Sequence, residues 1–90
     1  MKTLKIFISG NVQGVFFRHF IKQKADELGL KGFVRNLDDG RVEAVVEGKD
    51  ENINEMVEVC KQGPPQSYVK DVQIEELKYQ GFKDFKILRI

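Results

Sequence analysis

The chain has 90 residues, enough for one core, and we expect residues 1–90 to form a single domain. Fifteen basic and fourteen acidic side chains give a net charge of +1 with the signs interleaved, which argues against a broad basic surface for nucleic acid or a membrane. A single cysteine, Cys60, excludes an intramolecular disulfide, and a single histidine, His19, excludes a Cys/His zinc site. No signal region opens the chain and no apolar stretch approaches the roughly 20 residues of a membrane span, so we expect a cytoplasmic, reduced environment.

The first half of the chain predicts a strand, a helix and two further strands. Apolar and other residues alternate over residues 4–9, the period-2 pattern of a strand. A helix is predicted from apolar residues at helical spacing, and Gly29 suits its C-terminal stop. The apolar residues of this helix are Phe17, Phe20, Ile21, Ala25 and Leu28. Residues 31–36 and 41–47 predict strands, and Asp39-Gly40 between them is a two-residue hairpin signal.

The second half predicts a helix followed by two strands. Asp50 or Asn52 is expected to cap the helix, with Asn52 and Glu55 at capping-box spacing. Residues 53–60 carry one apolar stripe, and Gly63-Pro64-Pro65 ends the helix. Strands follow around residues 69–74 and 85–87. The order β-α-β-β-α-β predicts an α+β fold, the ferredoxin-like split β-α-β sandwich, with an antiparallel sheet and both helices on one face.

The segment from Gly10 to Arg18 is the most informative part of the chain. A strand ends there in a glycine-bearing loop that brings an arginine to the start of a helix. Gly14 can adopt a positive φ, and the N–H groups of residues 14–18 can then face one point, where the Arg18 fork can hold phosphate oxygens. The alternative is an ordinary connection with a solvated arginine. The loop lacks the Gly-Lys-Ser/Thr ending of a nucleotide-binding P-loop, so ATP is not expected.

A second polar position of interest is Asn36, at the end of the strand over residues 31–36. Its carboxamide carries a donor and an acceptor and can therefore hold and orient a water molecule. The alternative is that Asn36 forms the turn. Asp38 and Asp39 could hold magnesium, but Asp-Gly at a hairpin tip is also favoured for conformational reasons.

Together the two segments resemble the acylphosphatase family. Residues 10–18 match its Gly-x-Val-Gln-Gly-Val-x-Phe-Arg pattern, and residues 32–42 match its Gly-aromatic-Val-basic-Asn-x-x-x-Gly-x-Val pattern, followed by Gly48. The resemblance implies hydrolysis of acyl phosphates to a carboxylate and inorganic phosphate, without metal, cofactor or covalent intermediate. It implies that Arg18 and the amides of Gly14, Val15, Phe16, Phe17 and Arg18 hold the phosphoryl group, and that Asn36 positions the attacking water.

The residues present suit this reaction. The leaving carboxylate is stable and needs no strong general acid, so positioning and charge stabilisation carry the catalysis. His19 is the one histidine available as a general base, but it is expected to point about 100° away from Arg18 around a helix axis and to lie at the surface or rim. The water's proton is expected to pass to a phosphate oxygen of the substrate. Phe16 is expected either to form an apolar wall beside the acyl group or to pack in the core, and Cys60 is expected in the core.

Three other functions share this order of elements. An RNA-recognition module is disfavoured because Lys31-Gly32-Phe33-Val34 continues without further aromatics on what would be the wrong strand. A ligand-sensing regulatory domain and an acylphosphatase-like domain of a hydrogenase-maturation protein usually accompany further domains. We therefore favour a free-standing, monomeric hydrolase of small acyl phosphates, with no nucleic acid or membrane partner.

Overall fold

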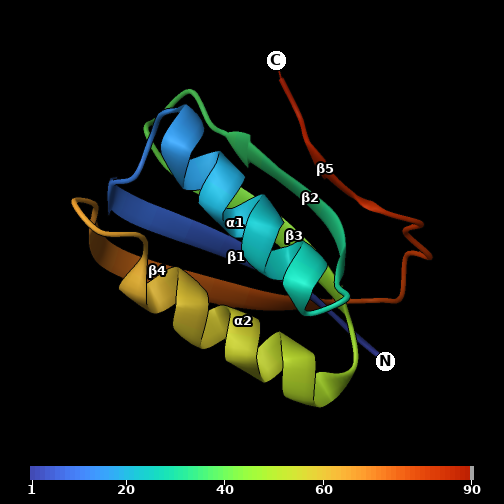
Figure 1. Ribbon diagram of the computed structural model, residues 1–90. Helices are drawn as coiled ribbons and strands as arrows, with labels where there is room; N and C mark the ends of the chain where they lie inside the picture. Colours follow the sequence, from blue (N-terminus) through green and yellow to red (C-terminus); the bar gives the residue numbers. More distant parts are fainter. Residues whose placement is uncertain (90) are drawn as a thin grey trace.

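The computed structural model describes residues 1–89, which form two helices on one face of a five-stranded sheet (Figure 1). The elements follow in the predicted order, and the predicted fold class is confirmed. They are β1 (Lys2–Asn11), α1 (Val15–Glu27), β2 (Lys31–Asn36), β3 (Val42–Gly48), α2 (Asp50–Gln62), β4 (Tyr68–Leu77) and β5 (Phe85–Ile87). Within residues 1–89, neither helix is long and apolar enough to cross a membrane.

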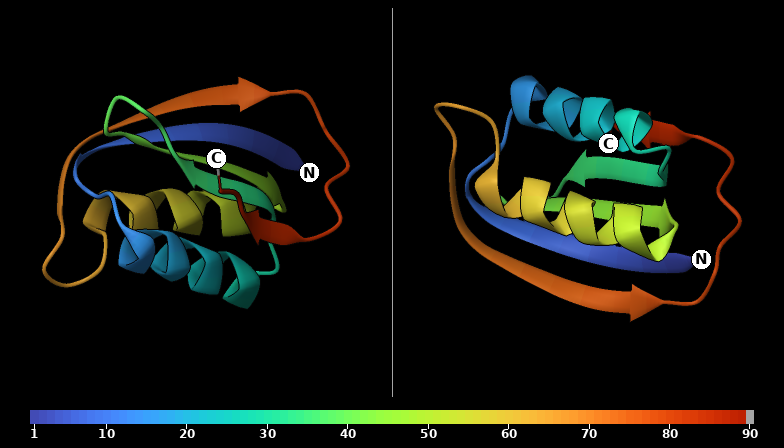
Figure 2. Two further views of the ribbon diagram at one scale, coloured as in Figure 1. Left: turned by 90° about the horizontal axis from the view of Figure 1, so that it is seen from above. Right: turned by 60° about the horizontal axis from the view of Figure 1, so that its bottom comes forward.

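The sheet has the strand order β4-β1-β3-β2-β5. The four longer strands pair antiparallel as predicted, but β5 pairs parallel to β2, so the sheet is mixed. The reason is the connection between β4 and β5. It leaves one edge of the sheet and returns the chain to the opposite edge in the direction of β2 (Figure 2).

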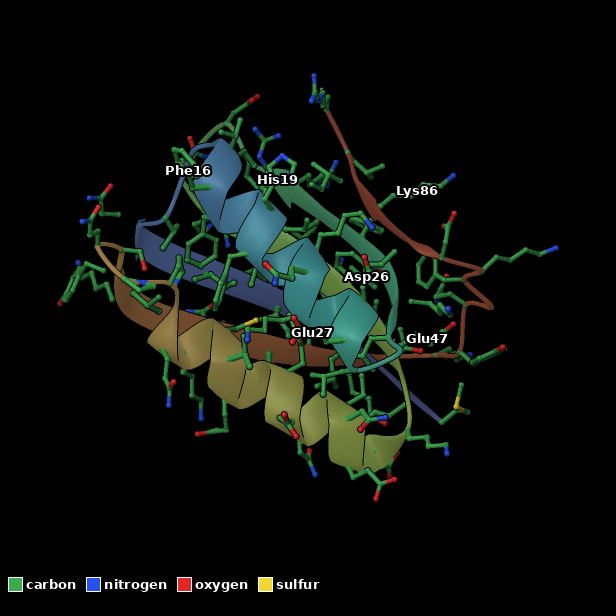
Figure 3. All side chains as sticks on the ribbon, in the orientation of Figure 1. Phe16, His19, Asp26, Glu27, Glu47 and Lys86 are labelled. Carbon is green, nitrogen blue, oxygen red and sulfur yellow. The ribbon has the colours of Figure 1, made fainter. Side chains whose placement is uncertain are left out.

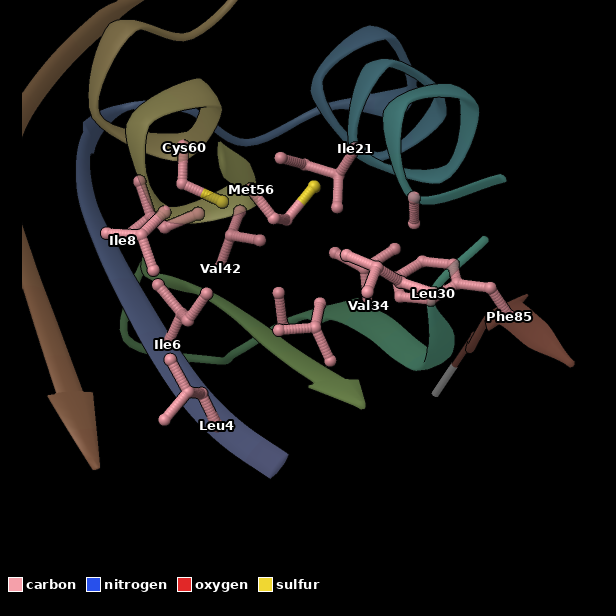
Figure 4. Close-up of a cluster of buried hydrophobic side chains, with 14 of the residues drawn as sticks. Leu4, Ile6, Ile8, Ile21, Leu30, Val34, Val42, Met56, Cys60 and Phe85 are labelled. Carbon is pink, nitrogen blue, oxygen red and sulfur yellow. The ribbon is translucent and has the colours of Figure 1, made fainter. Parts of the chain in front are cut away.

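The core lies between the helices and one face of the sheet. Alternate residues of β1, β2 and β3 point toward the helices, and the apolar stripes of α1 and α2 cover them (Figure 4). Phe17 and Ile21 are buried as predicted, and Cys60 lies in the core, whereas Phe20 is only partly buried against it. The fully buried members from the strands are Ile6, Ile8, Val34, Val42, Ala44 and Val46.

The other face of the sheet has its own buried polar centre at Glu47, which is 1% exposed. The carboxylate accepts hydrogen bonds from the Thr3 hydroxyl, from the backbone N–H of Gln80 at 2.6 Å and from that of Phe82 at 2.9 Å. Burial by itself raises the pKa of Glu47, but these hydrogen bonds together outweigh it and lower the pKa below its ordinary value. Glu47 thus fastens the connection between β4 and β5 to the sheet.

Two local predictions are wrong. Neither Asp50 nor Asn52 caps α2, because the helix already begins at Asp50 and its N-cap is Lys49, with no side-chain cap hydrogen bond. The connection between β2 and β3 is also wider than a two-residue turn. It spans residues 37–41 and is closed by the Leu37 N–H donating to the Arg41 carbonyl at 2.8 Å.

Candidate active site

The loop between β1 and α1 is fixed at both ends by apolar anchors. Val12 is buried, and Phe17 is 3% exposed, whereas residues 13–16 between them lie at the surface. Just before the loop, β1 contains a bulge at Ser9/Gly10, where a Cβ at Gly10 would overlap the backbone of β4. The bulge bends the end of the strand and directs the loop toward the start of α1.

No side chain at the start of α1 accepts a hydrogen bond from the first N–H groups of the helix. Its N-cap is Gly14, which has no side chain and has φ 120° and ψ 168°, a conformation essentially restricted to glycine. The first turn contains no acidic residue and no side-chain cap. The first four N–H groups of a helix have no intrahelical partner and carry partial positive charge, so this end of α1 is suited to an anion.

Arg18 and Asn36 both contain a buried polar atom without a protein partner. They are Arg18 Nε and Asn36 Oδ1, and no other buried side-chain nitrogen or oxygen atom of residues 1–89 lacks a hydrogen bond. Asn36 is the last residue of β2 and lies opposite Val42 of β3, so it does not form the turn itself. Buried polar groups in proteins are normally satisfied, and an exception of this kind indicates a ligand or water site.

The fold brings the two sequence motifs together at one end of the molecule. Gln13 Nε2, in the loop before α1, donates hydrogen bonds to the Leu37 carbonyl at 2.7 Å and to the Arg41 carbonyl at 3.2 Å. Gln13 directly precedes Gly14, and Leu37 directly follows Asn36. Gln13 was not singled out from the sequence, although it belongs to the first motif, because its partners lie 24 and 28 residues away.

The remaining titratable side chains near the site are otherwise engaged or exposed. His19 is exposed at the rim of the site, as expected (Figure 3). The Asp39 carboxylate accepts hydrogen bonds from the Arg41 side chain at 2.9 Å and from the Arg41 backbone N–H at 3.1 Å. These bonds lower the pKa of Asp39 and hold it in the turn.

Within residues 1–89, no three His, Cys, Asp or Glu side chains group as metal ligands do. Burial raises the pKa of Cys60 to about 12, so its thiol stays protonated.

An open groove of about 560 Å³ borders the loop. It lies between the start of α1 and the connection from α2 to β4, and Phe16, Phe20, Pro64 and Pro65 supply apolar surface. Phe16 is 85% exposed, which rules out the core-packing alternative for this side chain. Arg18 and Asn36 do not line the groove, and the hairpin that follows Asn36 lies on the other side of the start of α1 (Figures 1 and 2).

Comparison with known proteins assigns the chain to a family. The acylphosphatase family model matches residues 4–87. The chain belongs to the acylphosphatase family. It is 49% identical over 86 residues to the acylphosphatase of Acaryochloris marina, covering 96% of this chain and 92% of that one. It is also 49% identical over 80 residues to the acylphosphatase of Rubrobacter xylanophilus, covering 89% of this chain and 73% of that protein.

The structure agrees with this assignment. The crystal structure of acylphosphatase from Bacillus subtilis superposes with a TM-score of 0.94 at 40% identity, covering 99% of this chain and 100% of that one. The protein is therefore a hydrolase that acts on acyl phosphates, and the RNA-recognition and regulatory alternatives are wrong.

Proposed function

We propose that acyl phosphates are hydrolysed at the junction of the loop and α1, with Arg18 and Asn36 as the catalytic residues. The backbone N–H groups of Gly14, Val15, Phe16, Phe17 and Arg18 hold the phosphoryl group. The observation that carries this proposal is the pair of orphaned atoms, since Arg18 Nε and Asn36 Oδ1 are the two unpartnered buried side-chain atoms of residues 1–89. One is a donor suited to a phosphate oxygen, and the other is an acceptor suited to a water proton.

The phosphoryl group is stabilised by charge and by preorganised donors. In the transition state, negative charge is spread over three equatorial oxygens. The amides at the start of α1 and the Arg18 guanidinium face that charge without having to reorganise. Each critical donor of this kind contributes about 3–4 kcal/mol to the lowering of the barrier. We expect no metal or cofactor to be required.

Asn36 acts on the other reactant, the water. Its Oδ1 accepts a hydrogen bond from the water and directs the oxygen lone pair at phosphorus. The new P–O bond forms as the bond to the carboxylate oxygen breaks, and the water's proton passes to a phosphate oxygen. The carboxylate leaves with the bonding electron pair and needs no general acid.

The groove beside the loop is suited to the acyl group. In-line displacement requires the leaving group to lie opposite the attacking water. Asn36 ends β2 just before the hairpin, which lies on one side of the start of α1, and the groove opens at the other side, toward the connection that contains Pro64 and Pro65. The exposed Phe16 ring supplies an apolar wall there, which favours acyl phosphates with apolar or aromatic acyl groups.

The roles of Arg18 and Asn36 can be tested by hydrolysis of benzoyl phosphate in the presence of EDTA. We expect Arg18→Ala and Asn36→Ala each to lower kcat/KM by at least about 100-fold. For Arg18→Ala, the loss should fall on KM and on inhibition by phosphate as well as on kcat, because the guanidinium binds the phosphoryl group before and during the reaction. For Asn36→Ala, it should fall mainly on kcat. Lys31→Ala and Asn54→Ala, at exposed positions, are matched controls, and Lys31 begins β2 at the end of the strand opposite to Asn36. Folded variants of Arg18 and Asn36 that retain wild-type rates would contradict the proposal, and loss of wild-type activity in EDTA would contradict the metal-free reaction.

The acyl groove is tested by comparing two substrates. Phe16→Ala should raise KM for benzoyl phosphate about tenfold and leave that for acetyl phosphate nearly unchanged, because only the larger group reaches the ring. Tyr68→Ala removes another exposed aromatic side chain, one that does not line the groove, and serves as the control. Equal changes in KM for both substrates would contradict the assignment of the groove.

We also propose that residues 1–90 act as one domain, as a monomer and in the cytoplasm. The buried, unpaired Cys60 supports the proposed location, because a free thiol is compatible with a reducing compartment. Size-exclusion chromatography with light scattering measures the oligomeric state.

A further inference from the structure

We propose that Gln13 is a positioning residue that sets the place of Asn36 relative to the bound phosphoryl group. This inference rests on the proposed role of Asn36 as the residue that aligns the water. Gln13 carries the one side-chain hydrogen-bonded link, within residues 1–89, between the loop before α1 and the hairpin that follows Asn36.

The link uses both hydrogens of the Gln13 carboxamide. Nε2 donates to the Leu37 carbonyl at 2.7 Å and to the Arg41 carbonyl at 3.2 Å. The same two carbonyls also close the hairpin, since the Leu37 carbonyl accepts from the Gly40 N–H at 3.2 Å and the Arg41 carbonyl accepts from the Leu37 N–H at 2.8 Å. Gln13 therefore binds both sides of the hairpin base at once.

The opposite face of the hairpin is held by β1. The Arg41 guanidinium lies 4.6 Å from the centre of the Phe7 ring and is paired with Asp39 at 2.8 Å. These contacts fix the hairpin to the sheet, but they do not reach the loop that carries Gly14. Without Gln13, no side-chain hydrogen bond within residues 1–89 would join the loop before the phosphate cradle, the backbone N–H groups of residues 14–18, to the hairpin.

The link joins the neighbours of the two reacting groups. Gly14 follows Gln13, and Leu37 follows Asn36, so the bond to the Leu37 carbonyl joins two residues that each lie one position, about 3.8 Å of chain, from Gly14 or Asn36. A misplacement of about 1 Å between reacting groups can lower a rate by about 100-fold. We therefore expect the Gln13 side chain, which joins the loop to the hairpin, to influence kcat strongly.

The two hydrogen bonds from Gln13 Nε2 require the carboxamide group of a glutamine. Two facing carbonyls require two donors from one side chain and no competing acceptor between them. Glutamate offers only acceptors when ionised, and methionine offers no donor. Gln13→Met and Gln13→Glu thus remove the link in two different ways.

A double-mutant cycle with Asn36→Ala tests the proposal on benzoyl phosphate. In the wild-type background, Gln13→Met and Gln13→Glu should each lower kcat about 10- to 100-fold, with inhibition by inorganic phosphate changed less than about threefold for Gln13→Met. In the Asn36→Ala background, Gln13→Met should lower kcat less than about threefold, because its effect passes through Asn36. Gln73→Met, at an exposed position on β4, is the control. Thermal unfolding identifies the variants that are folded at the assay temperature. If Gln13→Met is not folded at that temperature, the cycle is measured with Gln13→Glu instead.

The outcomes separate this proposal from the one on which it rests. If Asn36→Ala itself retains its kcat, the proposed role of Asn36 fails. If Asn36→Ala loses activity but the two losses multiply, or if Gln13→Met weakens phosphate inhibition while kcat is kept, then Gln13 does not act through Asn36 and the present proposal is overturned.

Discussion

The two helices begin in opposite ways. At the start of α2, Asp50 and Glu51 place two carboxylates in the first turn, beside the exposed N–H groups. At the start of α1 there is no acidic side chain, and Gly14 supplies no side chain at all. Neither helix has a side-chain cap hydrogen bond. The helices have 13 residues each and pack on the same face of the sheet, so the difference is local.

The difference shows where the negative charge for each helix comes from. Carboxylates near a helix N-terminus stabilise it by about 0.3–1 kcal/mol each. Helix α2 obtains this stabilisation from its own sequence. Helix α1 has no such charge in its first turn, a position that the proposed function assigns to the phosphoryl group of the substrate, and its folding is supported instead by the buried Phe17, Ile21 and Ala25.

Val15→Asp would give α1 the kind of first turn that α2 has. Val15 is half exposed, so little packing is lost. We expect thermal stability to rise slightly and inhibition by inorganic phosphate to weaken about 100- to 200-fold, because two negative charges about 5 Å apart at an effective dielectric constant near 20 repel by about 3 kcal/mol. A rise in thermal stability together with weaker phosphate inhibition would indicate that the start of α1 binds the anion.

The matched change is Asp50→Asn in α2. It should lower the free energy of unfolding by about 0.3–1 kcal/mol and leave phosphate inhibition unchanged. Calorimetry and inhibition assays measure both quantities. A Val15→Asp variant with unaltered phosphate inhibition would show that the start of α1 does not hold the anion.

Gly14→Ala tests the backbone of the same helix start. A Cβ at Gly14 would meet no atom within 4 Å, so the cost comes from the positive φ and amounts to about 1–3 kcal/mol of unfolding free energy. Relief of that strain moves the amides of the cradle, and we expect kcat/KM to fall at least about tenfold.

Gly29→Ala is the control for this change. Gly29 also has a positive φ, 68°, and open space around its Cβ position, but it lies just beyond the C-terminal end of α1. It should lose stability and keep activity when both are measured by chemical unfolding and benzoyl phosphate hydrolysis. Equal losses of activity in both variants would assign the effect to stability alone.

The sequence predicted the architecture because its patterns are local. Alternation in β1 and the apolar stripes of the helices depend only on nearby residues, and both appear in the structure. The two motifs also placed Arg18 and Asn36 at element ends, where the structure has them. The cap of α2 was predicted wrongly because Asp50 acts on the first turn by charge from inside the helix, which sequence spacing does not distinguish from capping.

The parts that could not be predicted depend on distant contacts. Asp39-Gly40 is a hairpin signal, but the turn is wider because the Leu37 and Arg41 backbone atoms close it from farther out. Gln13 and Glu47 find their partners 24 to 44 residues away, and a polar residue gives no local sign of such a partner. The parallel pairing of β5 likewise depends on the path of the chain around the sheet.

Glu47 offers a reference within the same protein for an anion bound by backbone N–H groups. Its carboxylate accepts hydrogen bonds from the N–H groups of Gln80 and Phe82, as we propose that the phosphoryl group does at the start of α1. It lies at the other end of the molecule from Phe16 and the loop (Figure 3), so its loss should leave kcat at about pH 7 unchanged. Glu47→Gln removes an acceptor atom from the buried group and should lower the free energy of unfolding by about 1–3 kcal/mol at neutral pH.

The pH dependence of this loss follows from the lowered pKa of Glu47. A carboxyl group whose pKa is lower in the folded than in the unfolded state contributes stability above the unfolded pKa, about 4.3, and loses that contribution as pH falls through the folded pKa. The stability difference between wild type and Glu47→Gln should therefore be largest near neutral pH and shrink below about pH 4. Urea unfolding across this range measures it, and a difference that stays constant down to about pH 3 would mean that the donors of Thr3, Gln80 and Phe82 do not hold the ionised carboxylate.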